Sequence, residues 1–145
     1  MNKNLSIENA RLIFKNFTGE ASKYNRAGNR HFSVVIPNDM VEDLLADGWN
    51  VKSLRPREEG DEPLYFLEVT IGYNIPPRIY LITSTNKTLL NEDTIDSLQF
   101  VDIINVDIII RPYNWEVNGK HGVKAYVKTM YVTIDEDEFA HKYEE

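Results

Sequence analysis

The chain has 145 residues, no cysteine, three histidines and a formal net charge of −7 at pH 7. A chain of this length buries about two-thirds of its unfolded surface, so a single domain needs no disulfide or metal to hold it together. The composition excludes thiol catalysis and cysteine-ligated zinc, and the histidines His31, His121 and His141 lack partners at metal-ligand spacing. No segment approaches the about 20 apolar residues of a membrane span and no signal-peptide core is present, so we expect a cytosolic protein.

The first half of the chain is predicted to be mainly β with one short helix. Residues 5–17 alternate as a strand does. Its two faces would carry Ala10, Leu12 and Phe14, and Arg11, Ile13, Lys15 and Phe17. Breaker residues then predict a loop at 18–30. Further elements are expected as a strand at 31–36, a helix from Asn38 or Asp39 to Ala46, a strand at 49–54 and a charged excursion at 55–63.

The second half predicts a long β-hairpin. Strands at 64–73 and 78–83 come first, followed by a short helix at 91–98. Long strands at 104–115 and 122–134 then flank Asn118 and Gly119. Asn-Gly between alternating runs is the strongest short-range hairpin signal, because a type I′ turn needs positive φ at both central residues.

The register of this hairpin places a mixed aromatic and basic set on one sheet face. With Asn118 and Gly119 as the turn, Tyr113 lies opposite Lys124, Arg111 opposite Tyr126, and Ile109 opposite Lys128. One face would then carry Arg111, Tyr113, Trp115, Lys124, Tyr126 and Lys128. The other would carry the core residues Ile108, Ile110, Ala125, Val127 and Thr129. Pro112 indicates an edge strand or a bulge that would shift this register.

Interleaved rings and cations are typical of single-stranded nucleic-acid binding, because bases stack on the rings while Lys and Arg follow the phosphates. Tyr and Trp on strands are also ordinary half-buried sheet residues, and basic residues are often only the solvated face. The first strand and its loop add further candidates: Lys15, Phe17, Lys23, Tyr24, Arg26 and Arg30. On the strand at 78–83, Arg78 and Tyr80 share one face.

The negative charge is concentrated at the C-terminus. Residues 135–145 contain six acidic residues and one basic residue, whereas residues 1–34 contain six basic and two acidic ones. The tail is interpreted either as a solvated terminus or as a segment that docks on partner proteins or competes with DNA. Its candidate partner-binding residues are Asp135, Glu136, Asp137, Glu138, Phe139, Glu144 and Glu145.

Enzyme chemistry finds little support in the sequence. Carboxylate pairs such as Glu58 and Glu59 lie in polar, solvated stretches, where no burial raises a pKa for acid–base work. No phosphate-binding glycine loop and no nucleophile elbow is present. We therefore expect no enzymatic activity, no metal and no cofactor, with a metal-dependent nuclease built from scattered acids as the weakest alternative.

Several segments resemble bacteriophage single-stranded DNA-binding proteins. The resemblance lies in residues 8–17 (ENARLIFKNF), 47–52 (DGWNVK), 56–63 (PREEGDEP) and 106–120 (VDIIIRPYNWEVNGK), with Asn25, Gly28, Asn29, Arg30 and Phe32. It implies an OB-fold, a small β-barrel that binds oligonucleotides across its second and third strands and the adjoining loops. The six or seven predicted strands exceed the five of a simple OB barrel.

The sequence therefore predicts a mainly β protein with an OB-fold-like barrel, two short helices and an acidic C-terminal tail. Residues 1–134 would form the nucleic-acid-binding domain and residues 135–145 the tail. The expected function is sequence-tolerant binding of single-stranded DNA in phage replication or recombination. The alternative is a non-enzymatic module that binds other proteins through the tail or a sheet edge. Replication or recombination proteins and a second copy of the chain are the further partners considered.

Overall fold

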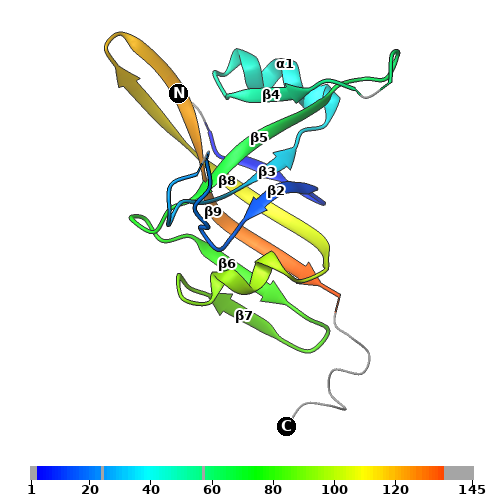
Figure 1. Cartoon of the computed structure of the whole chain (residues 1–145), viewed down its shortest axis with the longest axis vertical. Coiled ribbons are helices and arrows are strands. Elements are labelled where there is room, and N and C mark those ends of the chain that lie inside the picture. Colours follow the sequence, from blue (N-terminus) through cyan, green and yellow to red (C-terminus); the bar gives the residue numbers. More distant parts are fainter. Residues whose placement is uncertain (1–2, 24, 57, 136–145) are drawn as a thin grey trace.

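The computed structural model describes residues 3–23, 25–56 and 58–135, and these residues are mainly β (Figure 1). In chain order the elements are β1 (Leu5–Ile7), β2 (Leu12–Asn16), β3 (Arg30–Val35), α1 (Asn38–Ala46), β4 (Val51–Leu54), β5 (Leu64–Ile71), β6 (Arg78–Ile82), β7 (Lys87–Leu90), the 3₁₀ helix η1 (Ile95–Gln99), β8 (Ile103–Val117) and β9 (Lys120–Ile134). The predicted mainly β class is confirmed. The prediction missed β7, and the segment expected as a helix at 91–98 forms the short 3₁₀ helix instead.

The central strands build a partly open barrel of the OB type. β3 is antiparallel to β5, β5 is parallel to β9, and β9 is antiparallel to β8. The N-terminal segment joins the two ends of this row, because β1 pairs with β8 and β2 pairs with β3. Between them, the Ala10 N–H donates to the Val106 carbonyl over 2.7 Å, and the Val35 N–H donates to the Arg11 carbonyl over 2.9 Å. A parallel third and fifth barrel strand with a shared first strand is the OB arrangement, to which β4, β6 and β7 are additions.

The core fills the inside of this barrel. Phe17 and Phe32 stack there with ring centroids 5.5 Å apart. Ile95 and Leu98 of η1 are fully buried against the barrel core. The Gln99 side chain fixes η1 to the end of β2, because it accepts the Phe17 N–H at 2.7 Å and donates to the Lys15 carbonyl at 3.0 Å. The barrel is therefore held together by contacts between segments far apart in the sequence.

The first predicted strand is divided and bulged. Asn9 and Phe14 both have φ 52°, and the pairing shifts between Ile13, opposite Ser33, and Asn16, opposite His31. One extra residue in a strand reverses the alternation of its faces. Phe14 is consequently 55% exposed and Phe17 is 0% exposed. The prediction that Phe17 lies on the outer, nucleic-acid-binding face is wrong.

The β8–β9 hairpin follows the predicted register near its turn and departs from it farther from the turn. Asn118 and Gly119 have φ 52° and 80°, as a type I′ turn requires. Arg111 lies opposite Tyr126 and Tyr113 opposite Lys124, as predicted. Beyond Ile110, opposite Val127, the pairing shifts, so that Ile109 lies opposite Thr129 rather than Lys128. Lys128 is the bulged residue, and after it the buried positions of β9 change to Met130 and Val132.

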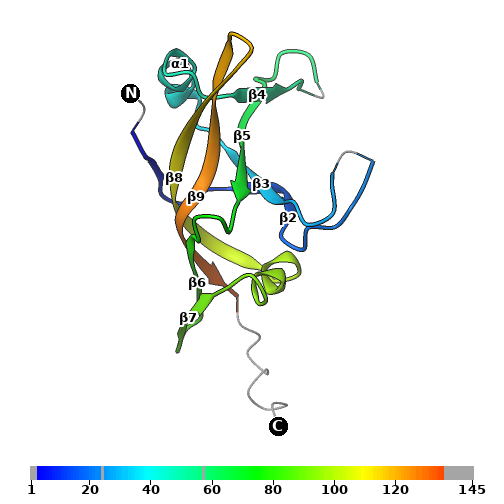
Figure 2. The ribbon, with the colours of Figure 1, turned by 90° about the vertical axis from the view of Figure 1, so that its left-hand side faces the viewer.

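The hairpin tip and the β6–β7 pair extend from opposite parts of the barrel. In Figure 2 the hairpin tip stands at the top, near α1 and β4, while β6 and β7 lie at the lower end. Leu45 of α1 is 52% exposed, whereas Val41 and Leu44 of the same helix are buried. No helix in the part of the chain that the structure describes is long and apolar enough to cross a membrane.

Candidate nucleic-acid interface

Five side chains on the outer side of the β8–β9 hairpin form the surface that we call the hairpin face: Arg111, Tyr113, Trp115, Lys124 and Tyr126. The structure brings together all five of these predicted residues, because cross-strand partners and residues two apart share one side of a sheet. Tyr113 is 52% exposed and Trp115 is 38% exposed. Large rings in this position are accessible to a flat ligand.

Tyr126 lies at the centre of the hairpin face. Its ring meets that of Tyr113 edge to face, with centroids 6.2 Å apart at 90°. The Arg111 guanidinium carbon lies 5.1 Å from the Tyr126 ring centre, and the Lys124 ammonium lies 5.2 Å from it. These distances are those of cation–π contacts. The cations are therefore held beside the ring, where they can reach the phosphates of a strand whose bases stack on it.

Two glycines make room for the rings of this face. A Cβ at Gly72 would lie 3.1 Å from Cε1 of Tyr126, and a Cβ at Gly122 would lie 2.8 Å from Cζ2 of Trp115. Gly122 is the cross-strand partner of Trp115, so the indole lies directly over the opposite backbone. The position of Trp115 depends on the absence of a side chain at 122.

Gly122→Ala is expected to displace the Trp115 indole without unfolding the protein. A Cβ placed 2.8 Å from Cζ2 of Trp115 requires movement, and the exposed ring moves more easily than the paired backbone. We expect stronger acrylamide quenching of tryptophan fluorescence and a loss of stability of about 1 kcal/mol or less, the scale of an overpacking change at an exposed site. His121→Ala, next to it on the other side of the strand, serves as the control. Unchanged quenching in Gly122→Ala would contradict this placement of the indole.

The hairpin face continues onto β5. Thr70 of β5 pairs with Tyr126, so its outer side is continuous with that of β9. A groove of about 580 Å³ lies between the hairpin and β5, and its lining includes Trp115, Lys124, Glu68 and Thr70. Glu68 forms an ion pair with Lys52 of β4 at 3.4 Å. A nucleic-acid strand bound to the hairpin face could extend along this groove at one end.

Two phenylalanines that the sequence analysis did not select extend this outer surface. Phe14 of β2 meets Phe66 of β5 edge to face, with centroids 5.5 Å apart. Phe66 pairs with Val35 and Lys52 on the outer sides of β3 and β4. Alternation along β5 could have identified Phe66, whereas the bulge that exposes Phe14 leaves no signal in a simple two-residue pattern.

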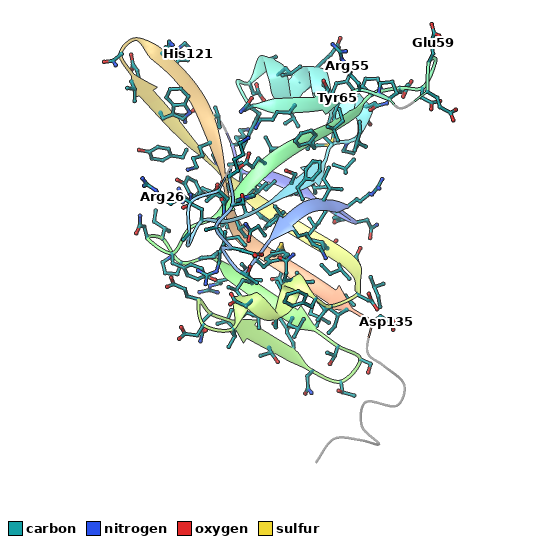
Figure 3. The ribbon with its side chains drawn as sticks, in the orientation of Figure 1. Arg26, Arg55, Glu59, Tyr65, His121 and Asp135 are labelled. Carbon is teal, nitrogen blue, oxygen red and sulfur yellow. The ribbon has the colours of Figure 1, made fainter. Side chains whose placement is uncertain are left out.

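The loop at 17–29 lies between β2 and β3, on the same side of the molecule as the hairpin. Figure 3 labels Arg26 there and His121 near the hairpin tip. Asn25 stabilises the loop, because its amide donates to the carbonyls of Glu20 at 2.8 Å and Asn29 at 3.2 Å. Arg26 is exposed, as is Lys23. Tyr24, also predicted to bind, lies outside the described residues.

Arg30 has a structural role in this arrangement. Its Nε donates to the Phe17 carbonyl at 3.0 Å, and its guanidinium forms ion pairs with Asp96 at 3.4 Å and Glu92 at 3.8 Å. The Arg30 side chain is only 17% exposed. The prediction that Arg30 binds phosphate is not supported by this placement, because two carboxylates already neutralise its charge.

The two remaining predicted lysines differ in their position relative to the hairpin face. Lys15 is half-buried and lines a separate groove with Arg11 and the start of β8. Lys128 is exposed at the bulge, where it lines a groove of about 230 Å³ with Arg78 and Arg111. The structure therefore brings Lys128 close to the hairpin face and leaves Lys15 outside it.

Asp135 is the one predicted tail residue that the structure describes. It is exposed, and its N–H donates to the Asp102 carbonyl at 2.8 Å. The other tail residues, Glu136, Asp137, Glu138, Phe139, Glu144 and Glu145, lie outside the described residues. Within residues 3–23, 25–56 and 58–135, no three acidic or histidine side chains gather as metal ligands would.

The strand arrangement places the chain in the class of OB-type β-barrels. A family model described as "Putative phage ssDNA-binding domain" matches residues 1–145, so the chain belongs to this family of phage single-stranded DNA-binding proteins. The resemblance found in the sequence is thereby confirmed.

Solved structures of low sequence identity share the fold. The single-stranded DNA-binding protein from bacteriophage Enc34 in complex with ssDNA is similar with a TM-score of 0.60 and 10% identity, over 94% of this chain and 89% of that chain. A C-terminal truncation of the Enc34 protein is similar with a TM-score of 0.58 and 11% identity, over 92% of this chain and 87% of that one. No curated protein matches the sequence.

Proposed function

We propose that this phage protein binds single-stranded DNA through the hairpin face, with little dependence on base sequence. The observation that supports this most directly is the ring of Tyr126, whose centre lies 5.1 Å from the Arg111 guanidinium carbon and 5.2 Å from the Lys124 ammonium, and which meets the exposed ring of Tyr113. Stacking requires unpaired bases and accepts any of them, since every base has an aromatic face. The hairpin face therefore suits single strands better than duplex.

The remaining parts of the proposal follow from the family. Phage proteins of this class would act on the single strands of replication or recombination, in the cytoplasm of the infected cell. Binding of this kind protects and straightens a strand and requires no bond to be broken, so we propose a non-enzymatic role. Arg26, which lies on the same side of the molecule as the hairpin, would approach the same DNA strand there.

Titration with an oligo-dT strand tests the proposal. Trp115 is partly exposed on the hairpin face, whereas Trp49 is buried, so stacking is expected to quench tryptophan fluorescence mainly through Trp115. The logarithm of the binding constant should fall with the logarithm of salt concentration, with a slope of about −0.7 per phosphate neutralised. Repeating the titration between about 50 and 200 mM salt then gives the number of phosphate contacts.

Two controls make this experiment decisive. Trp115→Phe should retain binding, measured by the anisotropy of a labelled oligonucleotide, while most of the quenching is lost. A duplex of the same length should bind more weakly than the single strand. No binding of oligo-dT at the lowest salt concentration would contradict the proposal.

A further inference from the structure

A second cluster of rings and a cation lies on β6, β7 and β9, away from the hairpin tip. Tyr80 of β6 and Tyr131 of β9 stack with centroids 5.2 Å apart and an angle of 9° between the rings. The Lys87 ammonium lies 4.5 Å from the Tyr80 ring centre and 5.2 Å from that of Tyr131. We call these three residues the tyrosine–lysine cluster. Both rings are half-buried and Lys87 is exposed.

Strand pairing builds this cluster on the outer side of the sheet. Tyr80 pairs with Tyr131 in the parallel β6–β9 ladder, and Lys87 is the partner of Ile82 across the β6–β7 hairpin. Lys87 has no carboxylate within ion-pair distance in the described part of the chain, in contrast to Arg30 and Lys52. Asp107 is the partner of Tyr131 on the opposite edge of β9, where it accepts the Asn9 N–H at 3.0 Å. The cation is therefore available to an anionic ligand.

A cationic groove connects this cluster with the hairpin face. Arg78, Arg111 and Lys128 line the groove of about 230 Å³ described above. Arg111 also contacts the ring of Tyr126, and Arg78 is two residues before Tyr80 on the same side of β6. Along β9 the five steps from Tyr126 to Tyr131 span about 17 Å, at about 3.3 Å per residue. Three cations thus line the surface between the rings of the hairpin face and those of the tyrosine–lysine cluster.

We propose that the tyrosine–lysine cluster is a second contact site for the same single strand, which leaves the hairpin face through the cationic groove. Bases beyond the groove would stack against the tyrosine rings, and Lys87 would contact a phosphate. This inference rests on the proposed function, because the first part of the strand must lie on the hairpin face. The site would add affinity only for strands long enough to reach it.

The test compares a short and a long oligo-dT, of about 5 and about 15 nucleotides, within the range of about 4–16 nucleotides that OB-folds cover. For Lys87→Gln we expect a loss of about tenfold with the long strand, a salt slope lower by about 0.7, and unchanged binding of the short strand. Tyr80→Leu should weaken long-strand binding and leave the salt slope unchanged. Arg55→Gln is the matched control, because it removes one exposed positive charge from the distant 55–63 excursion (Figure 3).

The outcomes separate this inference from the proposed function. Failure of the wild-type protein to bind either strand would overturn the proposed function, and this inference with it. Wild-type binding of both strands, with no length-dependent loss in Lys87→Gln, would overturn the second site and leave the hairpin face in place. Thermal unfolding of each variant identifies a loss of fold, and the change in salt slope for Lys87→Gln is a readout that a purely structural tyrosine pair would not produce.

Discussion

Replacing Trp115 and Tyr126 together by alanine is expected to weaken single-strand binding by about 30-fold or more. Each base stacked on an aromatic ring contributes about 1–3 kcal/mol, and the two substitutions remove two of the rings on the hairpin face. A loss of 2 kcal/mol, the lower end of about 2–6 kcal/mol, corresponds to this factor. Poly-dT, poly-dA and mixed sequences should lose affinity to a similar extent, because stacking reads no base edge. Anisotropy titrations with labelled oligonucleotides measure the change.

The salt slope and two further variants make the result specific. The double variant should keep the wild-type salt slope, since Arg111 and Lys124 remain. Tyr126→Phe should bind as tightly as wild type, because the ring rather than the hydroxyl carries the stacking. Phe100→Ala removes a ring that is 86% exposed outside the hairpin and should have no effect. Binding of poly-dT by the double variant with wild-type affinity would show that the hairpin face is not the site.

Phe17→Ala is expected to cost about 3–5 kcal/mol of folding stability, the range measured for a buried phenylalanine reduced to alanine. Phe17 is fully buried and stacks on Phe32, so its removal leaves a cavity between β2 and β3. The midpoint of thermal unfolding should fall by about 10 °C, at about 2–4 °C per kcal/mol for a chain approaching 150 residues. Denaturant unfolding provides the free energy directly.

Phe14→Ala is the matched comparison, because Phe14 lies in β2 and Phe17 directly follows that strand. Its ring is exposed and meets Phe66 edge to face, so we expect a loss of stability of about 1 kcal/mol or less. The opposite result, with Phe14→Ala the more destabilising variant, would mean that β2 is regular and that Phe17 faces outward. The two variants thus test the bulge at Phe14 directly.

The hairpin was predictable because its determinants are local. Asn118 and Gly119 set the turn, and the turn sets which residues lie opposite each other on the strands next to it. Arg111, Tyr113, Trp115, Lys124 and Tyr126 therefore gather as predicted. The family resemblance was also available, because residues 106–120 form a continuous motif.

The two bulges could not be predicted from alternation. A bulge adds one residue to a strand and exchanges its faces, but the sequence on either side still alternates. Phe17 was consequently placed on the binding face with Arg11 and Lys15, and Lys128 was placed opposite Ile109. The ion pairs of Arg30 were equally hidden, because Asp96 and Glu92 are more than 60 residues away in the sequence.

The sequence by itself determined the mainly β composition, the hairpin turn and the rings and cations beside it, because each depends on neighbouring residues. Only the tertiary structure decided which phenylalanine enters the core, which arginine is neutralised, and how a cationic groove links the hairpin face to Tyr80 and Tyr131. Those features depend on which strands become neighbours in the barrel. The parallel pairing of β9 with both β5 and β6 brings distant segments together, and no local pattern encodes it.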